Sequence, residues 1–373
     1  MNVPKLRFKE FNDEWSFTEL AKISSDISYG MGLASKEYDG VNKYIRITDI
    51  DEKTNKYSNK DIVSPDGVLE DKYLVNKNDI LFARTGASTG KTYLYDEKDG
   101  KLYFAGFLIR ANIFNHDANF IFQQTKTNKY NKWVKIMSMR SGQPGINSQE
   151  YGSYKFSITS PEEEEKISKT LNLLDKKIEL QTKKIEDLKL FKLCTAKIIF
   201  KDNSLLCKKQ LKELCNIVKG KQINSEFLSE TGEYYMLNGG INPSGFINEY
   251  NTNENTISIS EGGNSCGYVN FNKSKFWAGG HCYTITPIDI NNIYLYQILK
   301  YNENKIMDLR VGSGLPNIQK KDLENFSINV HHSNMQNKIA TILSSIDKLI
   351  DLEEKKINDI EKLKKGLMQN MFV

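Results

Sequence analysis

The chain has 373 residues, 39% of them hydrophobic and 27% charged, and 52 Lys and Arg against 47 Asp and Glu give a formal net charge of +5. That length allows two or three ordinary domains, and the mild positive charge permits nucleic-acid binding without demonstrating it. The sequence lacks a run of about 18 apolar residues and an apolar core near its N-terminus, which predicts a cytoplasmic protein, neither secreted nor membrane-spanning. Five cysteines without a Cys-x-x-Cys pair argue against a disulfide framework and a zinc site.

Residues 1–160 contain short apolar and aromatic segments broken by Gly, Asn and Asp, which is typical of a β-rich domain. Within them, residues 83–92 read ARTGASTGKT and are similar to a phosphate-binding loop, but Gly86 and Gly90 enclose three residues where that loop requires four. Residues 92–95 favour a strand rather than the helix whose N-terminus would hold phosphate. We predict a glycine-bearing connection between two strands; the alternative is a nucleotide hydrolase built around residues 86–92.

A long helix is predicted over residues 161–200. Ser160 and Pro161 are followed by four glutamates, which suits a helix N-terminus because acidic side chains there complement the helix dipole. The apolar residues that follow are spaced as in a coiled-coil heptad seam. These seam positions are Ile167, Leu171, Leu174, Ile178, Ile185 and Leu188.

The remainder of the chain repeats the first part. Residues 166–188 match residues 338–360 at an offset of 172, GQPGI at 142–146 matches GLPNI at 314–318, and RTGASTGKT is aligned with EGGNSCGYV at 261–269. The second copy therefore comprises a β-rich domain over residues 201–332 and a long helix over residues 333–373. Its seam positions are Ile339, Leu343, Ile346, Ile350, Ile357 and Ile360.

Each seam lacks one apolar position, which is Gln181 in the first helix and Glu353 in the second. A helix of this length spans roughly 54 Å and is too long to bury its seam on one small domain. We therefore predict an α+β fold in which two β-rich domains are separated by two long helices that form an antiparallel coiled coil. The alternative is that each helix is a core helix of its own domain.

This arrangement resembles the specificity subunit of a type I restriction-modification enzyme. The residues that carry the resemblance are YLVNKNDILFARTG at 73–86, the Gly-x-Pro-x-Ile turns before each helix, and the two similar helices; Asn78 stands where the family often has Gly. The resemblance covers essentially the whole chain. It implies two target-recognition domains, each reading one half of a bipartite, asymmetric sequence in double-stranded DNA, and helices that set the length of the unread spacer.

The resemblance also implies partner subunits. Two methyltransferase subunits that use S-adenosylmethionine would dock on the helices, and restriction subunits that use ATP and Mg²⁺ would join them, so that this chain is non-catalytic and carries no cofactor. The sequence agrees, because Asn242-Pro243-Ser244-Gly245 lacks the second proline and the aromatic residue of an amino-methyltransferase loop and reads as a turn. His116, His281, His331 and His332 show no metal-binding spacing, and we expect them at the surface or at domain edges.

Candidate DNA-binding residues follow from the side chains that suit base edges and phosphates. In the first copy they are Arg46, Arg84, Thr85, Ser88, Lys91, Arg140 and Gln143, and in the second Lys219, Lys221, Glu261, Asn264, Ser265, Arg310 and Ser313. Arg84 is aligned with Glu261, which predicts that a guanine reader in one copy becomes a cytosine reader in the other. The alternatives are a glycine bend with ordinary exposed side chains and a coiled-coil scaffold whose β domains bind protein or carbohydrate.

Overall fold

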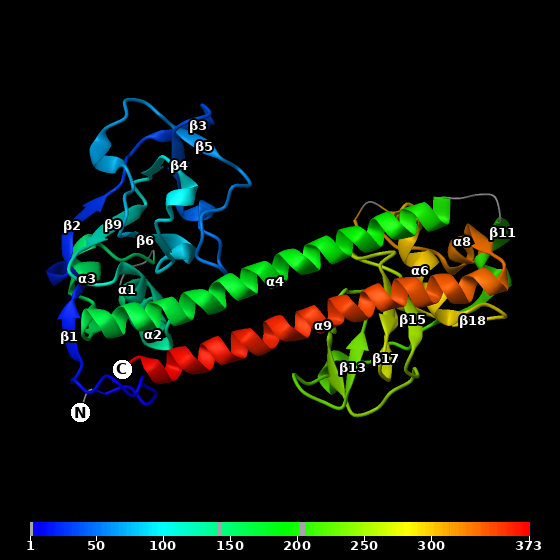
Figure 1. Cartoon of the computed structure of the whole chain (residues 1–373). Coiled ribbons are helices and arrows are strands. Elements are labelled where there is room, and N and C mark those ends of the chain that lie inside the picture. Colours follow the sequence, from blue (N-terminus) through cyan, green and yellow to red (C-terminus); the bar gives the residue numbers. More distant parts are fainter. Residues whose placement is uncertain (1–2, 140–143, 202–205, 313) are drawn as a thin grey trace. The chain divides into compact units, whose positions relative to one another are not determined.

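A computed structural model describes residues 3–139, 144–201, 206–312 and 314–373 (Figure 1). Arg140, Gln143 and Ser313, three of the candidate residues, lie outside this description. The chain divides into two compact units, unit 1 with residues 1–180 and 357–373 and unit 2 with residues 181–356. Both long helices, α4 (Pro161–Lys201) and α9 (Ser333–Met371), contribute residues to both units. Within the described segments, no helix is both long enough and apolar enough to cross a membrane.

Unit 1 is built around a four-stranded antiparallel sheet in the order β2-β9-β6-β7. Its central strand β6 is buried on both faces, because Ile80 and Phe82 pack into one hydrophobic cluster and Leu81 and Ala83 into another. The sheet strands are β2 (Ser24–Tyr29), β6 (Asp79–Ala83), β7 (Thr92–Leu94) and β9 (Leu108–Ile113). Three strand pairs surround it: β1 (Ser16–Glu19) with β10 (Lys155–Ile158), β3 (Ala34–Glu37) with β5 (Val63–Asp66), and, in parallel, β4 (Lys43–Ile45) with β8 (Leu102–Phe104).

Short helices complete unit 1. They are α1 (Ala118–Gln124), α2 (Asn128–Ser138), α3 (Ser148–Ser153) and the 3-10 turns η1 (Leu20–Lys22), η2 (Ile47–Asp49), η3 (Asp71–Tyr73), η4 (Gly86–Ser88) and η5 (Glu97–Asp99). Buried residues of α1, β6, β9 and the start of α4 share the main core cluster of the unit with Met371 at the end of α9. The domain and the two helix segments of unit 1 therefore fold as one body.

Unit 2 repeats this topology. Its four-stranded antiparallel sheet has the order β12 (Cys215–Lys219), β18 (Cys282–Pro287), β15 (Thr256–Ser260), β16 (Val269–Asn272). The surrounding strands are the pair β11 (Leu206–Gln210) with β19 (Ser327–His331), and β13 (Tyr234–Leu237) between parallel β17 (Phe276–Ala278) and antiparallel β14 (Gly245–Ile247). Its helices are α5 (Leu211–Leu214), α6 (Asn292–Tyr301), α7 (Glu303–Met307), α8 (Lys320–Asn325) and η6 (Ser225–Phe227). The duplication predicted from the sequence is thus a duplication of structure.

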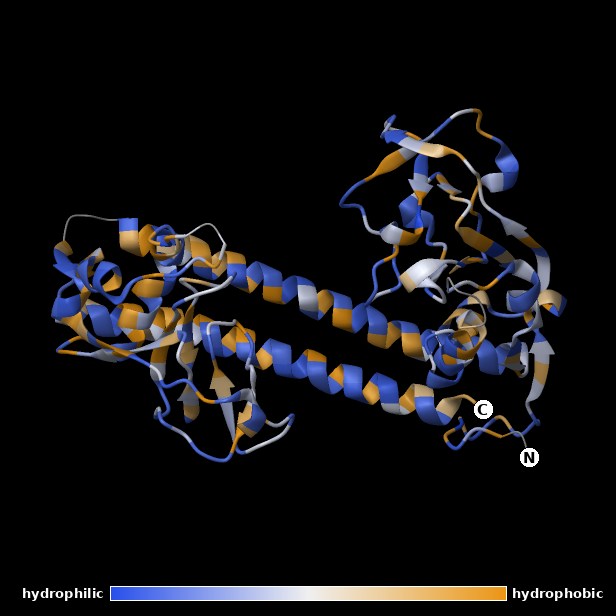
Figure 2. Cartoon of the chain, turned by 180° about the vertical axis from the view of Figure 1, so that it is seen from behind, coloured by the Kyte–Doolittle hydropathy of each residue, from blue (hydrophilic) through white to orange (hydrophobic). Residues whose placement is uncertain are grey.

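The long helices run antiparallel within each unit. In unit 1, Lys364 of α9 pairs with Asp175 of α4. In unit 2, Lys184 pairs with Glu353 at 2.8 Å and Lys192 with Asp347 at 2.6 Å, so the residue number rises on α4 as it falls on α9. The two helices therefore form the predicted antiparallel coiled coil and also pack on the β-rich domains. Figure 2 shows hydrophobic and hydrophilic residues interspersed along both.

The seam positions differ in depth. Seven are less than 9% exposed, namely Ile167, Leu171, Ile185, Ile339, Leu343, Ile346 and Ile350. The others are half-buried, namely Leu174, Ile178, Leu188, Ile357 and Ile360.

The two polar seam positions lie against each other in unit 2. The amide nitrogen of Gln181 donates to the carboxylate of Glu353, which is only 3% exposed. Lys184 and Lys356 also donate to this carboxylate, at 2.8 and 3.1 Å, and they lower the pKa of Glu353 below its usual value. The break in each heptad pattern is thus one polar contact, and such directional contacts fix helix register more strictly than apolar packing does.

The glutamates at the start of α4 have a second role that the sequence pattern did not indicate. Glu163 and Glu164 are fully buried. Glu163 accepts two hydrogen bonds from the Arg7 guanidinium, both at 2.7 Å, and one from Trp15 Nε1 at 3.2 Å. Glu164 lies 2.9 Å from His116 Nδ1. The N-terminal residues of the chain are therefore tied to the beginning of the first long helix.

One histidine departs from the expected surface position. His331, at the end of β19, is 7% exposed, and its ring nitrogen Nδ1 lies 2.9 Å from the Tyr294 hydroxyl. Strand pairing with β11 and packing against α6 place it inside unit 2, which residue spacing alone does not reveal.

Lys126 provides a test of the packing of unit 1. Its ammonium lies 3.8 Å from Asp175 Oδ2 and 4.2 Å from the centre of the Phe122 ring, and burial, followed by repulsion from Lys364, lowers its pKa to about 8. Since an unfolded lysine keeps its proton to about pH 10.4, the free energy of unfolding should rise between about pH 8 and pH 10.4. We expect Lys126→Met to stabilise unit 1 at pH 7 by on the order of 2 kcal/mol and to flatten this rise.

The measurement is urea unfolding from pH 7 to pH 10 in a Trp277→Phe background, in which the remaining tryptophans, Trp15 and Trp133, both belong to unit 1. Lys132→Met, at an exposed position of α2, is the control and should change stability by less than about 0.5 kcal/mol. Identical pH profiles for wild type and Lys126→Met would contradict the prediction.

Candidate functional site

A glycine-bearing hairpin loop lies at the same place in each sheet. In unit 1 it joins β6 to β7, with Ala83 N donating to Lys91 O at 2.8 Å and Gly90 N to Ala83 O at 2.9 Å. In unit 2 it joins β15 to β16, with Gly267 N donating to Ser260 O at 2.8 Å. Because residue 92 opens a strand, the predicted connection between two strands is confirmed and the loop does not precede a phosphate-binding helix.

The two Gly-x-Pro-x-Ile turns dock on these loops through equivalent hydrogen bonds. In unit 1, Gly86 N donates to Pro144 O at 3.0 Å and Ile146 N to Arg84 O at 2.9 Å. In unit 2, Gly263 N donates to Pro316 O at 3.0 Å and Ile318 N to Glu261 O at 2.9 Å. Two motifs that lie far apart in the sequence thus form one surface in each unit. We call it the loop–turn surface, comprising residues 84–91 with 144–146 and residues 261–268 with 314–318.

The first loop position carries Arg84 in unit 1. Its guanidinium lies over the ring of Tyr29, 4.9 Å from the ring centre. Its Nε is buried and has no hydrogen-bond partner among the described residues. Buried donors without a partner are rare in proteins and invite a functional explanation. Arg84 is therefore held by stacking while part of its hydrogen-bonding capacity is unused.

The same position carries Glu261 in unit 2, where it is 8% exposed. Its carboxylate accepts from Lys219 Nζ at 2.5 Å and from the Tyr283 hydroxyl at 3.1 Å, and lies 3.3 Å from His281 Nδ1. Burial and the neighbouring Glu261 charge raise the pKa of Tyr283, which keeps the hydroxyl protonated as a donor. Glu261 is thus a satisfied carboxylate whose partners Lys219 and His281 are themselves exposed, with side chains 50% and 61% accessible.

The partners of these two residues also occupy equivalent places. Tyr29 ends β2 and Lys219 ends β12, each directly before a glycine that lies close to a neighbouring strand. The copies therefore carry Tyr with Arg in one unit and Lys with Glu in the other. This paired change preserves a favourable contact while reversing the charge at the loop.

The remaining loop candidates differ in their surroundings. Thr85 forms a β-bridge with Gly145, Ser88 lies in η4, and Lys91 Nζ pairs with Glu52 at 2.8 Å. In unit 2, Asn264 is exposed and Ser265 half-buried. These residues share the loop–turn surface with Arg84 or Glu261.

Three described candidates lie outside the loops. Arg46 makes a bidentate ion pair with Asp49, at 2.9 and 2.8 Å, which occupies its guanidinium. Lys221 is exposed, two residues beyond Lys219, and Arg310 is exposed immediately before Val311, whose backbone pairs with Asn317 of the turn. Lys221 and Arg310 thus lie close in sequence to elements of the loop–turn surface, whereas Arg46 is bound to its own turn.

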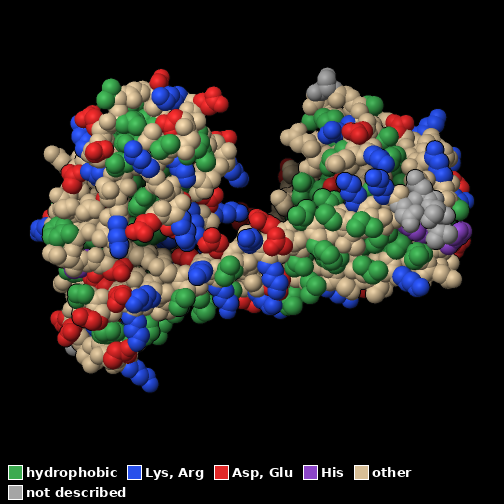
Figure 3. Space-filling model, turned by 45° about the horizontal axis from the view of Figure 1, so that its top comes forward, with side chains coloured by type: hydrophobic (Ala, Val, Ile, Leu, Met, Phe, Trp, Pro, Cys, Tyr) green, Lys and Arg blue, Asp and Glu red, His purple; other side chains and the backbone are tan. Residues whose placement is uncertain are grey.

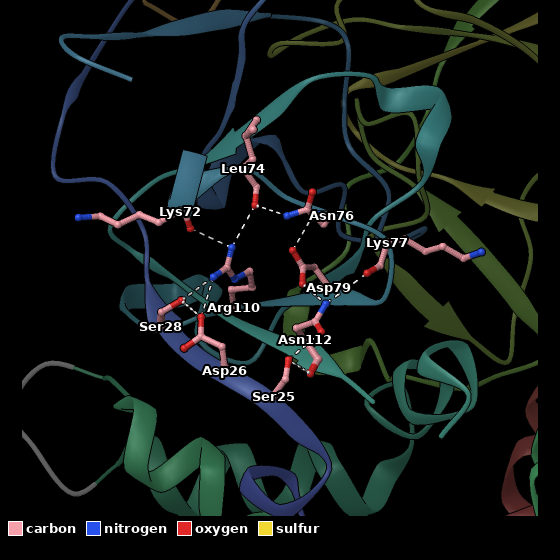
Figure 4. Close-up of polar contacts among 10 residues, drawn as sticks. All are labelled: Ser25, Asp26, Ser28, Lys72, Leu74, Asn76, Lys77, Asp79, Arg110 and Asn112. Atoms are coloured by element: carbon pink, nitrogen blue, oxygen red, sulfur yellow. Dashed lines mark hydrogen bonds and ion pairs between the residues drawn. The ribbon is translucent and has the colours of Figure 1, made fainter. Parts of the chain in front are cut away.

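A polar network across strands β2, β6 and β9 of unit 1 was not indicated by the sequence (Figure 4). Arg110 of β9 donates to Asp26 Oδ2 at 2.6 Å and to the carbonyl oxygens of Lys72 and Leu74 at 2.9 and 3.0 Å. Asp79, at the start of β6, is 1% exposed and accepts from Asn112 Nδ2 at 2.7 Å, and burial raises its pKa. The one available signal was an acidic residue at the start of an apolar strand.

This network joins three strands of the unit 1 sheet. It connects the strands β2, β6 and β9 through side chains, so that the ends of β2 and β6, which carry Tyr29 and Arg84, are held in fixed register. The described part of the chain contains no group of three or more His, Cys, Asp or Glu side chains placed to hold a metal ion. At the loop–turn surfaces, Arg84, Lys91 and Asn264 present groups that can hydrogen-bond or carry charge.

Comparison with known proteins relates this geometry to one family. The model of the type I restriction modification DNA specificity domain matches twice, at residues 16–190 and 205–362. A relative from Mycoplasma pneumoniae, named as a candidate type I specificity subunit, is 36% identical over 182 residues, which cover 48% of each chain. The chain thus spans about half the length of the curated relatives that it matches at this level.

Solved structures show the same fold. The crystal structure of the S subunit of a type I restriction-modification system from M. genitalium aligns with a TM-score of 0.71 and 20% identity, over 100% of this chain and 99% of that one. A chain from a structure that concerns complex assembly and conformational transition of the type I system aligns with a TM-score of 0.54 and 16% identity, over 96% and 97%.

Proposed function

Because this chain belongs to the family of type I restriction modification DNA specificity domains, we propose that it is the DNA-recognition subunit of a type I restriction-modification complex. Each unit reads one half of a bipartite, asymmetric site in double-stranded DNA. The observation that carries the proposal is the pair of loop–turn surfaces, which share backbone hydrogen bonds and differ in chemistry at Arg84 and Glu261. Two equivalent readers with opposite charge suit two unlike half-sites.

The reading chemistry follows from donors and acceptors. Arg84 can donate to the O6 and N7 acceptors of guanine, since its side chain is half-buried and its guanidinium is held over the Tyr29 ring. In unit 2, Glu261 can accept from the cytosine amino group once Lys219 turns to a phosphate, since Lys219 is half-exposed and Tyr283 continues to hold the carboxylate. The exposed Asn264 supplies an amide of the kind that reads adenine.

Phosphate contacts surround these readers. Hydroxyl and cationic groups near the readers can donate hydrogen bonds to phosphate oxygens. They belong to Thr85, Ser88 and Lys91 of the unit 1 loop and to Ser265, Lys221 and Arg310 in unit 2. Figure 3 shows Lys and Arg side chains exposed on both units, with acidic side chains among them. A surface of mixed charge favours local contacts of this kind over binding by one large basic patch.

The helices supply a docking face for methyltransferase subunits. Leu180 and Phe191 of α4 are each 59% exposed, and the equivalent positions of α9, Leu352 and Leu363, are 49% and 54% exposed. Apolar residues exposed at matching places in both copies mark protein interfaces and suit two identical partners. Figure 3 shows hydrophobic side chains exposed along the helices.

The chemistry of methylation and cleavage then belongs to the partners. In this proposal the chain itself is non-catalytic and binds no cofactor, S-adenosylmethionine is bound by the methyltransferase subunits, and ATP and Mg²⁺ by the restriction subunits. What the chain contributes is two sequence readers and a pair of helices that set the spacer between the half-sites.

The decisive experiment is selection from a pool of random-sequence duplexes by the full-length chain assembled with its methyltransferase partner. Wild type should enrich two short half-sites separated by a fixed spacer. Arg84→Ala should lose about 1–3 kcal/mol of discrimination at a single base position of one half-site and leave the other half-site unchanged. Lys98→Ala, which removes a lysine side chain that is 89% exposed, is the control and should enrich the wild-type sequence.

Other outcomes point elsewhere. If Arg84→Ala weakens binding to all duplex sequences equally, Arg84 contacts a phosphate rather than a base. The absence of salt-sensitive duplex binding by the assembled wild type would contradict the proposal and support a scaffold whose β domains bind other partners.

A further inference from the structure

Three polar side chains meet where the domain of unit 1 rests on its two helices. Asp175 of α4 accepts from Lys364 Nζ of α9 at 2.5 Å through Oδ1, and from Gln123 Nε2 of α1 at 3.3 Å through Oδ2. One carboxylate therefore binds the opposite helix with one oxygen and the domain with the other. We call this set a joint.

Unit 2 contains the same joint. Asp347 of α9 accepts from Lys192 Nζ of α4 at 2.6 Å through Oδ1 and from Gln297 Nε2 of α6 at 2.7 Å through Oδ2. The helices exchange roles, because each aspartate comes from the helix that follows its own domain and each lysine from the other helix. In both units the joint ties one domain to two helices at once.

The same three residue types form the joint in both copies, although unit 1 adds Lys126 beside Asp175 and the loops differ. Asp175 and Lys192 become Asp347 and Lys364 at the same offset of 172 that aligns the helices. Gln123 and Gln297 occupy equivalent short helices. At the loop–turn surface, by contrast, Arg84 has become Glu261. The reading residues have diverged between the copies while the residues that seat the domains have stayed the same.

Burial makes the joint selective for one geometry. Gln123 and Gln297 are 1% and 3% exposed, and the Lys364 and Lys192 side chains 13% and 17%. A shift of either helix by one residue moves its side chains by about 1.5 Å and rotates them, which breaks hydrogen bonds of this length and leaves buried amides unpaired. The apolar seam lacks such directionality, since hydrophobic contact depends on area rather than angle.

An outer ion pair accompanies each joint one turn along the helix. Glu179 pairs with Lys56 at 2.6 Å in unit 1, and Asp351 pairs with Lys273 in unit 2. The two acidic residues are related by the helix offset of 172, whereas the two lysines are not. All four side chains are more than half exposed, so these pairs contribute little free energy. Like the buried joint, each outer pair connects the domain to the helix that follows it.

We infer that the joints are positioning elements: each one fixes the position of its recognition domain along the helix pair. Together they restrict the complex to one spacer length. This inference rests on the proposed function. Asp175, Lys364, Gln123, Asp347, Lys192 and Gln297 act through the placement of the loop–turn surfaces and do not themselves contact DNA. Loosening a joint should change which spacers are accepted while the half-site bases stay the same.

The experiment uses the full-length chain assembled with its methyltransferase partner and a pool of random-sequence duplexes as the probe. Lys192→Asp and Asp347→Lys should each reduce the preference for the wild-type spacer over spacers one base pair longer or shorter by about tenfold. The double exchange Lys192→Asp with Asp347→Lys should restore the preference, because Gln297 can rotate its amide and present oxygen in place of nitrogen. Glu354→Lys, which breaks the exposed pair with Lys189 on the same helices, is the matched control and should leave the spacer unchanged.

The single exchanges bury like charges, so a milder variant accompanies them. Gln297→Leu keeps the ion pair between the helices and removes only the tie to the domain, and it should also broaden the accepted spacers. The inference is overturned if folded Gln297→Leu keeps the wild-type spacer preference. It is also overturned if the double exchange prefers the wild-type spacer no more strongly than the single exchanges do. Failure of wild type to enrich any bipartite sequence would instead overturn the proposed function.

Discussion

Replacing Glu163 with alanine is expected to lower the free energy of unfolding of unit 1 by about 3–5 kcal/mol, because it leaves the Arg7 guanidinium unpaired in a nearly dry site. The Glu163 side chain is fully buried and that of Arg7 is 10% exposed. The same carboxylate accepts from Trp15 Nε1 and from the Thr159 hydroxyl, at 3.2 and 2.5 Å. Its removal therefore breaks four hydrogen bonds and leaves the donors of three side chains without their acceptor.

The measurement is urea unfolding at neutral pH in the Trp277→Phe background, where Trp15 and Trp133 report on unit 1. Glu162→Ala is the control, because the Glu162 side chain lies next to Glu163 at the start of the same helix but is exposed. It should lower the free energy of unfolding by less than about 1 kcal/mol, through the loss of its interaction with the helix dipole. The double change Arg7→Met with Glu163→Met should be less damaging than Glu163→Ala, because no charge remains buried. If Glu163→Ala lowers the free energy of unfolding no more than Glu162→Ala does, the ion pair between Arg7 and Glu163 contributes little to stability.

Gly30→Ala is expected to destabilise unit 1 by about 3 kcal/mol through overpacking against backbone. A Cβ at this position would lie 2.3 Å from the carbonyl oxygen of Ala105 and 2.4 Å from that of Phe104. Backbone atoms cannot move aside as a flexible side chain can. The substitution should also displace Tyr29, on which Arg84 stacks, and so weaken base discrimination at the unit 1 half-site.

Gly32→Ala provides the control two residues away, since a Cβ there would have no atom within 4 Å. It should change the free energy of unfolding by less than about 0.5 kcal/mol. Gly220→Ala tests the duplication, because its Cβ would lie 2.3 Å from Gly279 O and 2.4 Å from Ala278 O in unit 2. If Gly30→Ala and Gly32→Ala have equal free energies of unfolding, the backbone at the end of β2 can move away from the carbonyl groups of Phe104 and Ala105.

The conserved architecture of the two copies explains why so much could be predicted from the chain alone. The offset of 172 between the helices and the glycines of residues 86–90 and 263–267 are properties of neighbouring residues, visible without any tertiary contact. A heptad spacing and a break at Gln181 and Glu353 predicted an antiparallel pair, and the polar positions indeed meet. Short-range signals of this kind persist because backbone geometry acts within a few residues.

The sequence by itself thus determined the duplication, the alternation of β-rich domains with long helices, and the strand connection at residues 83–92. The tertiary structure alone decided which glutamates of residues 162–165 are buried, which residues stack or pair with Arg84 and Glu261, and that Asp175 meets Lys364 across 189 positions. The physical reason is range. Helix period and turn chemistry act between near neighbours, whereas the partner of a buried charge is set by the packing of elements distant in the chain, which no local pattern encodes.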